Sequence, residues 1–189
     1  MASEVTAAPT LGLDALTVLD RLTQLHLVCV AVQAPHNQFK LLHTIRNAAR
    51  AGLHALGETR QTVERLAKAA IRRCEIFGNA PQTPAVCAAL DEDRDVLHVA
   101  LRKVLTYPPE DQVATVLALR LATGLQPYWE VRGDAAQGRA LLSQALGRPG
   151  GGVARLHATI ARGALATIQS DWVAALLDLA PAHRLLPRP

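Results

Sequence analysis

The chain has 189 residues, enough for one compact domain or two small ones with a buried core. Half of its residues are hydrophobic but only 3% are aromatic, which favours close packing of Leu- and Ala-rich helices over a β-sandwich. The net charge of +4 is mildly basic and does not by itself indicate nucleic-acid binding.

The cysteines and the chain start indicate a cytoplasmic protein. Cys29, Cys74 and Cys87 are odd in number and lack C-x-x-C spacing, so a disulfide framework is not expected. The opening MASEVTAAPT has no basic start followed by an apolar run, and it does not resemble a signal peptide. No apolar stretch reaches the roughly 18 residues of a membrane helix.

The first 57 residues predict a helix, a β-hairpin and a second helix. Asp14 offers an N-cap for a short helix with leucines along one side. Residues 27–32 are β-rich, Pro35 begins a turn, and residues 38–41 return as a second strand. A stripe at helical spacing then runs from Leu42 until Gly57 ends the helix.

Further helices follow to the end of the chain. Residues 63–77 and 85–105 form two, and Pro108 and Pro109 then give the strongest candidate boundary. Two helical hairpins come next, one pairing 111–131 with 134–146 and the other pairing 153–169 with 171–180. A repeat array needs about three such units to be stable alone.

Single residues refine these hairpins. Asp134 and Asp171 are predicted to cap the second helix of each hairpin. Pro127 should kink the first repeat helix. The glycine-rich segment 147–152 between the hairpins is predicted to be a flexible connector.

The predicted fold class is therefore mainly α, with a winged-helix-like segment containing one β-hairpin, then linker helices and tetratricopeptide-like helical hairpins. The predicted divisions are a flexible N-terminus at 1–10, a winged-helix-like domain at 11–57, linker helices at 58–109, two helical hairpins at 110–181 and a flexible tail at 182–189.

Several segments carry a family resemblance in their shared order and spacing. Residues 39–50 read FKLLHTIRNAAR and precede an alanine-rich helix that ends in Gly57-Glu58. Residues 93–101 read DRDVLHVAL, and residues 121–133 contain Tyr128-Trp129 before an Arg-Gly turn and a Gly-Arg helix start. This order resembles the winged-helix and first-repeat region of LuxR-type and antibiotic-regulatory-type transcription factors, which are bacterial signal-transduction (STAND) ATPases.

The resemblance implies a regulator region without the family's ATPase and DNA-binding modules. The sequence has no G-x-x-x-x-G-K-[ST] phosphate loop, so no nucleotide binding is expected. In related ATPases a Met-His-Asp motif reaches the nucleotide. Here the matching residues are Leu41, Leu42 and His43, so nucleotide sensing does not transfer to His43.

Basic residues concentrate between positions 40 and 73, a segment that contains eight basic and only two acidic residues. The functional interpretation is a phosphate-contacting surface, and the alternative is a solvated or intramolecular helix face, which we favour. The candidate nucleic-acid contacts are Arg46, Arg50, Arg65, Lys68, Arg72 and Arg73.

The acidic run at 91–95 is interpreted as helix capping rather than a metal or acid/base site, and its charge could also pair with the basic helices. The seven histidines show no H-x-x-x-H or Cys/His zinc spacing, and no catalytic motif appears. We therefore expect no enzyme activity, no metal and no cofactor.

The few aromatic residues suggest where a protein partner could bind. Two of them come just before the first hairpin turn, where a groove lined by them would suit a peptide. The alternative is that Trp129 fills the core, which the repeat pattern favours. The candidate partner-binding residues are Tyr128, Trp129, Trp172, Leu176 and Leu179.

The leading hypothesis is a non-enzymatic protein–protein interaction module, a truncated or split relative of a LuxR-type regulator. One alternative is a small winged-helix DNA-binding protein that uses the basic 40–73 surface. Another is a non-functional gene remnant, which the incomplete array would fit.

Overall fold

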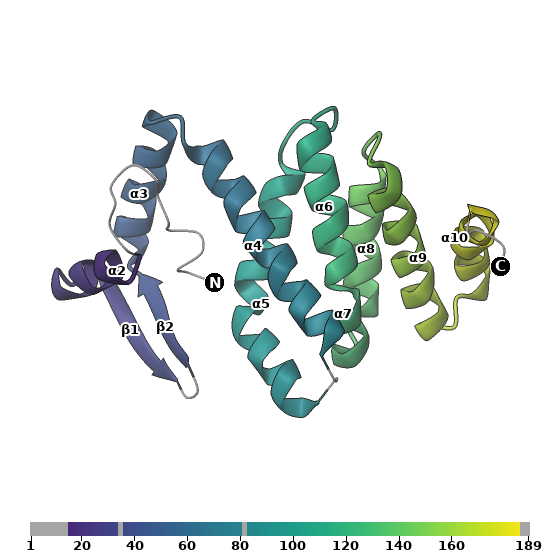
Figure 1. The fold of residues 1–189 in the computed structure, drawn as a ribbon, viewed down its shortest axis with the longest axis horizontal. Coiled ribbons are helices and arrows are strands. Elements are labelled where there is room, and N and C mark those ends of the chain that lie inside the picture. The colour runs from purple at the N-terminus through teal and green to yellow at the C-terminus, as the bar shows by residue number, and fades with distance from the viewer. Residues whose placement is uncertain (1–14, 34–35, 81–82, 186–189) are drawn as a thin grey trace. The chain divides into compact units, whose positions relative to one another are not determined.

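The computed structural model describes residues 15–33, 36–80 and 83–185, and over them the predicted mainly α fold with one antiparallel β-hairpin is confirmed (Figure 1). The chain divides into two compact units, residues 1–65 (unit 1) and residues 66–189 (unit 2). The division falls inside the predicted linker segment 58–109. Pro108 and Pro109 lie within unit 2. The predicted N-terminal tail at 1–10 lies outside the described residues.

Unit 1 has the predicted order of helix, hairpin and helix. Strand β1 pairs antiparallel with β2 in a register that places Val28 opposite Leu41 and Gln33 opposite His36. Val28 is 3% exposed, and β1 also contacts the preceding helix. Asp14 and Pro35, the predicted cap and turn residues, lie outside the described residues. The elements are α2 (Ala15–Gln24), β1 (Val28–Gln33), β2 (His36–Leu41) and α3 (His43–Ala55).

Helix α3 ends as the sequence predicts. Gly57 follows it with a φ of +70°, a left-handed backbone conformation that glycine adopts without strain. The predicted apolar stripe of α3 is not buried: Leu42 is 52% exposed and Leu56 is 73% exposed, and no residue of α3 is buried. The next helix, α4 (Thr59–Asn79), crosses the division between the two units.

Unit 2 is a stack of helices in which neighbours in sequence pack side by side (Figure 1). Helix α9 packs against both α6 and α8, and α10 packs against α9. This pattern is the one expected of stacked helical hairpins. The helices are α5 (Pro84–Leu105), α6 (Gln112–Gly124), α7 (Gln126–Arg132), α8 (Ala135–Leu146), α9 (Gly152–Ile168) and α10 (Trp172–Leu185).

The C-terminal part of α4 and all of α5 share the core of this stack. On α4, Arg73 pairs with Asp93 of α5 at 2.8 Å, and Glu75 pairs with Arg120 of α6 at 2.8 Å. Cys74 is 1% exposed against Gly124. The predicted linker helices therefore supply another hairpin of the stack. With them, unit 2 has the roughly three hairpins that a helical array needs.

Small residues let the stacked helices approach closely. A Cβ atom on Gly138 of α8 would lie 2.5 Å from the Trp129 ring and 2.7 Å from Leu165 of α9. A Cβ atom on Gly163 of α9 would lie 2.8 Å from the Leu179 side chain of α10. The Ala- and Gly-rich composition thus has a packing role, because larger side chains at these positions would push the helices apart.

Pro127 interrupts the first repeat helix, as predicted. The helix stops at Gly124, and α7 starts at Gln126 with Pro127 in its first turn. Proline is tolerated there because the first N–H groups of a helix have no partner within it.

The predicted tail begins later than expected. Helix α10 continues through Pro181 to Leu185, so residues 182–185 are helical, and residues 186–189 lie outside the described residues.

The predicted flexible connector at 147–152 is wrong, because two arginines tie it to the stack. The Arg148 side chain is 6% exposed and donates to Thr115 Oγ1 at 3.0 Å and to the carbonyl oxygens of Leu105, Tyr107 and Pro108 at 3.3, 3.0 and 2.6 Å. Arg155 donates to the carbonyl oxygens of Arg148 and Gly150 in the connector and of Leu146 at the end of α8. Carbonyl groups at the ends of helices lack partners within the helix, and these guanidinium groups supply donors for them.

Candidate interaction surface

Helix α10 is apolar on two opposite faces, and within the described part of unit 2 only one of them is covered by another helix. On the covered face Ala175 is 5% exposed where α10 packs on α9, and Leu179 lies against Gly163. The apolar surface of α10 that stays exposed, which we call the α10 outer face, consists of Val173, Leu176 and Leu177 on the opposite side and of Trp172 in the first turn; they are 74%, 68%, 71% and 64% exposed.

Charged groups at the start of α10 fix its position on the stack. Asp171 accepts the Ala174 backbone N–H at 3.2 Å, as predicted for a cap, and it pairs with Arg139 of α8 at 2.8 Å. Arg139 and the Ala174 N–H lower the pKa of the Asp171 carboxyl, with Arg139 the larger cause.

The acidic residue within α10 points inward. Asp178 is 7% exposed and takes two hydrogen bonds from Arg162 of α9, at 2.6 and 2.8 Å. The hydrogen bond to Asp178 raises the pKa of Arg162 above its ordinary value. The α10 outer face itself has no charged side chain.

The predicted partner-binding residues therefore divide into two groups. Trp172 and Leu176 lie on the α10 outer face, and Leu179 is half-buried on the inner side. Tyr128 and Trp129 are 2% and 0% exposed, so their prediction as partner-binding residues is wrong. They wedge between helices, as the alternative interpretation of Trp129 expected.

Buried polar contacts explain why these two aromatic residues belong to the core. The Trp129 indole N–H donates to His98 Nε2 at 3.3 Å, and the two rings stack with centroids 6.3 Å apart. Tyr128 donates its hydroxyl to Asp91 Oδ1 at 2.8 Å, and Arg132 also binds Asp91. Buried Tyr and Trp need such partners for their polar atoms.

Burial shifts the pKa values of three groups in this core. It lowers the pKa of His98, with Arg94 and Arg102 adding to the effect, so the neutral ring accepts the Trp129 N–H. Burial raises the pKa of Tyr128 to about 12, with the Asp91 hydrogen bond second. It also raises the pKa of Cys74 to about 12, which leaves that thiol protonated and unreactive.

The acidic run at 91–95 lies in the middle of α5, so its interpretation as helix capping is wrong. The helix starts at Pro84, where Thr83 Oγ1 accepts the Val86 N–H at 3.3 Å. The predicted charge pairing is confirmed by the Arg73–Asp93 contact.

Asp134 was also predicted to cap a helix, and its side chain accepts no capping hydrogen bond. Its backbone has φ −87° and ψ 25°, whereas a capping residue usually has an extended backbone that turns the side chain to the helix end. Its carboxylate lies 3.6 Å from Arg94 instead.

The predicted nucleic-acid contacts are divided between the two units. Arg46 and Arg50 are exposed on α3, Arg65 is half-buried in unit 1, and Lys68 and Arg72 are exposed on α4. Arg73 donates to Asp93 and to the Ala89 carbonyl oxygen at 3.4 Å, so its guanidinium group is already paired within unit 2.

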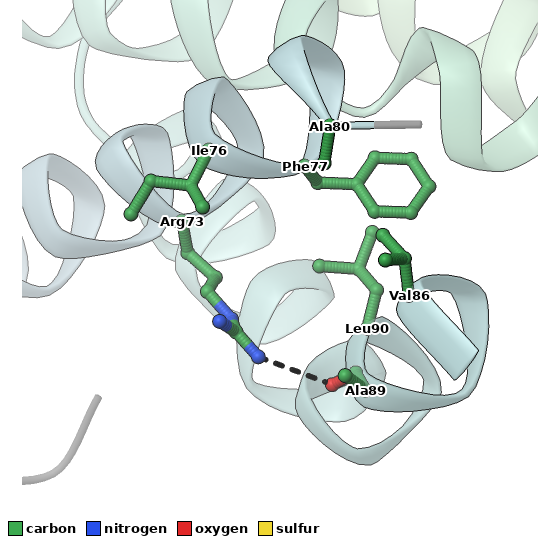
Figure 2. A pocket seen from close by; sticks show the side chains of 7 residues that line it. All are labelled: Arg73, Ile76, Phe77, Ala80, Val86, Ala89 and Leu90. Carbon is green, nitrogen blue, oxygen red and sulfur yellow. Dashed lines mark hydrogen bonds between the residues drawn. The ribbon is translucent and has the colours of Figure 1, made fainter. Parts of the chain in front are cut away.

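A small apolar pocket opens between α4 and α5, with a cavity volume of about 150 Å³ (Figure 2). Figure 2 shows the Arg73 guanidinium turned to the Ala89 carbonyl at one side of it, while Phe77 and Leu90 line the other side. The lining has one charged side chain, and that charge is already paired. The pocket therefore has no polar group free to orient a substrate. Its lining residues are Arg73, Ile76, Phe77, Ala80, Val86, Ala89 and Leu90.

Among the described residues, no cluster of three or more His, Cys, Asp or Glu side chains is placed to hold a metal ion. None of the helices in the described ranges has the length and apolar character to span a bilayer. No protein-family model, curated protein or solved structure matches this chain.

Proposed function

We propose that this chain is a protein–protein interaction module built from stacked helical hairpins, with the α10 outer face as its docking surface. The observation that carries the proposal is that α10 is apolar on both faces while α9 covers only one of them. Helices that are apolar all round normally lie between other elements. A helix from another polypeptide chain would complete the cover of α10.

The size of the α10 outer face supports docking. Four large side chains that are about two thirds exposed present on the order of 400 Å² of apolar surface in one place. Single exposed apolar residues are ordinary, but contiguous patches of this size on soluble proteins commonly mark interaction sites. The paired charges of Asp171 and Asp178 lie beside the patch and hold α10 in place to present it.

The module is proposed to be a relative of the helical arm of LuxR-type regulators that works without nucleotide. The order of helix, hairpin, helix and stacked hairpins supports this relation. The given sequence contains no phosphate loop, so nucleotide binding is not part of the proposal. Titration of the purified protein with ATP should give no saturable binding. Saturable micromolar affinity would contradict this part of the proposal.

Nucleic-acid binding is the second candidate, favoured by one observation. Helix α3 contains no acidic residue and exposes Arg46 and Arg50. If this face binds duplex DNA, affinity should fall steeply with salt, and Arg46→Glu with Arg50→Glu should abolish it. Affinity that survives both substitutions would exclude α3 as the contact.

The docking proposal is tested by site-specific photo-crosslinking in the cells that produce the protein. A benzophenone amino acid at Val173, on the α10 outer face, should give a discrete covalent adduct. The matched control position is Val99 on α5, which is 44% exposed and also belongs to unit 2. An adduct at Val173 but not at Val99 supports the docking surface, and equal labelling or no adduct at both contradicts it.

A further inference from the structure

We infer that unit 1 binds the surface of an anionic lipid bilayer, with helix α3 lying in the plane of the lipid headgroups. This inference is independent of the α10 outer face, which belongs to unit 2. It uses the same two arginines of α3 as the nucleic-acid candidate, so duplex DNA is included in its test.

Helix α3 has an apolar stripe that the described chain leaves largely uncovered. None of the other helices and strands in the described ranges packs extensively against α3. At the two ends of the stripe, Leu42 and Leu56 are 52% and 73% exposed. A helix of 13 residues is marginal in water by itself, so α3 would gain stability from an occupant that covers the stripe. The stripe residues, which recur at helical spacing, are Leu42, Ile45, Ala49, Leu53 and Leu56.

The charges around this stripe are all positive. Residues 21–57 contain four Lys or Arg and no Asp or Glu. Arg46 and Arg50 are exposed, and each follows a stripe residue by one position, which places both along one border of the stripe. Lys40 is exposed shortly before the helix begins. By charge complementarity, an apolar stripe with this border fits an occupant that is both apolar and anionic.

An anionic bilayer offers both properties at one surface. The apolar side of such a helix enters the boundary between headgroups and acyl chains, while its arginines extend back to the lipid headgroups. A bilayer also needs no matching shape, and exposed apolar residues continue from α3 into Phe39 and Leu41 of β2, which are 37% and 36% exposed. Duplex DNA would engage Arg46 and Arg50 through its phosphates but leave the leucines in water.

The inferred binding needs both the charges and the apolar stripe, because each is weak alone. One Lys or Arg near an anionic membrane surface strengthens binding only about fivefold. We therefore expect reversible binding that increases with the fraction of anionic lipid and weakens as the salt concentration rises.

Flotation of the purified full chain with lipid vesicles tests this inference. Vesicles of equimolar phosphatidylcholine and phosphatidylserine should carry the protein, and vesicles of phosphatidylcholine alone should not. Arg46→Gln with Arg50→Gln should weaken binding about 25-fold, because each arginine contributes about fivefold. Arg102→Gln with Lys103→Gln is the matched control, because it removes two exposed charges from unit 2, and it should leave binding unchanged.

A second pair of substitutions tests the apolar stripe separately. Leu42→Gln with Leu56→Gln should weaken vesicle binding about tenfold without changing the net charge. The same exchange at Leu176 and Leu177 removes two exposed leucines from α10 and should have no effect on vesicle binding. Circular dichroism should show each variant to be as helical as the wild type.

An environment-sensitive fluorophore gives a readout that does not depend on a disruptive variant. In a Cys29→Ser background, which removes the exposed cysteine, Ala49→Cys places a nitrobenzoxadiazole label on the stripe. Its emission should shift to shorter wavelength when vesicles with phosphatidylserine are added. The same label on Val99→Cys should not respond.

The outcomes separate the possible occupants of α3. Vesicles with phosphatidylserine that do not bind the chain, equal binding to neutral vesicles, or binding that the Leu42 and Leu56 substitutions leave intact each overturn the inference. If vesicles fail while duplex DNA binds and depends on Arg46 and Arg50, α3 is a nucleic-acid contact instead. The Val173 crosslink tests the α10 outer face separately, so that surface can stand or fail by itself.

Discussion

Replacing Arg148 with methionine tests the claim that the connector at 147–152 is part of the folded stack. Methionine keeps an unbranched side chain of similar length and removes the guanidinium group. The group lost donates four hydrogen bonds, to Thr115 Oγ1 and to three backbone carbonyl oxygens. All four of these acceptors are neutral oxygens, so the expected effect of the substitution comes from hydrogen bonds and not from an ion pair.

The magnitude follows from what each acceptor loses. A hydrogen bond from a charged donor contributes about 1.5–3 kcal/mol net, but such contributions are not additive. Pro108 is exposed, so water can reach its carbonyl region, whereas Thr115 is 0% exposed and its hydroxyl oxygen loses a donor while keeping its own hydrogen bond to the Pro109 carbonyl oxygen at 3.3 Å. We expect Arg148→Met to lower the free energy of unfolding by about 3 kcal/mol, which corresponds to roughly 10 °C in Tm for a unit of this size.

Urea and thermal unfolding followed by circular dichroism measure this change. The control is Arg102→Met, since Arg102 is an exposed arginine on α5, and its loss should alter stability by no more than about 0.5 kcal/mol. Amide hydrogen exchange in residues 147–152 should also accelerate in Arg148→Met. If the two variants are equally stable, the connector does not depend on Arg148 and the reasoning is refuted.

Two further predictions concern the core around Trp129. Because the folded state lowers the pKa of His98, the unfolded chain binds its proton first as the pH falls. The free energy of unfolding should therefore fall as the pH drops below about 6.5, by up to roughly 1.4 kcal/mol per pH unit. Urea titrations at several pH values should show a flatter pH dependence for His98→Gln. The same pH dependence in the variant and the wild type would contradict this prediction. Gly138→Ala should destabilise by about 2 kcal/mol because its Cβ would meet the Trp129 ring, whereas Gly78→Ala, with open space around it, should stabilise slightly. Equal Tm changes for the two glycine variants would show that the helices can separate without cost.

The helices and the hairpin could be predicted from sequence because their determinants are local. The spacing of apolar residues along 42–56 and the β-rich run at 27–32 depend only on near neighbours. Gly57 and Pro127 end or interrupt a helix through their own backbone properties, so these breaks do not depend on distant contacts. The burial of Trp129 could also be predicted, because helical repeats commonly place a large core residue just before the hairpin turn.

The contacts that hold the stack together could not be predicted, because they join residues far apart in sequence. Arg148 donates to carbonyl oxygens about 40 residues earlier in the chain. Without those contacts in view, the glycine-rich sequence of the connector predicts flexibility. The interpretation of the acidic run at 91–95 as helix capping was wrong because the run lies beyond the first turn of a helix that starts at Pro84, directly after the Thr83 N-cap. That start was readable from the sequence, whereas the pairing of Asp93 with Arg73 required the fold.

The candidate surface was predicted in part. Trp172 and Leu176 were singled out, and the structure leaves both exposed. Val173 and Leu177 were missed, although their spacing on α10 could have shown that the helix is apolar on two sides. Which of those sides α9 covers depends on Gly163 and on the Arg162–Asp178 pair, and neither is apparent from α10 alone.

Hydroxyl-radical footprinting of Trp172 in intact cells tests the central claim most directly. Trp172 is 64% exposed and Trp129 is fully buried, so the chain contains its own internal reference. In dilute purified protein, Trp172 should be oxidised readily and Trp129 should not. If the α10 outer face is a docking surface, Trp172 should be protected in the cell relative to the dilute protein. Equal oxidation of Trp172 in both settings would contradict the account.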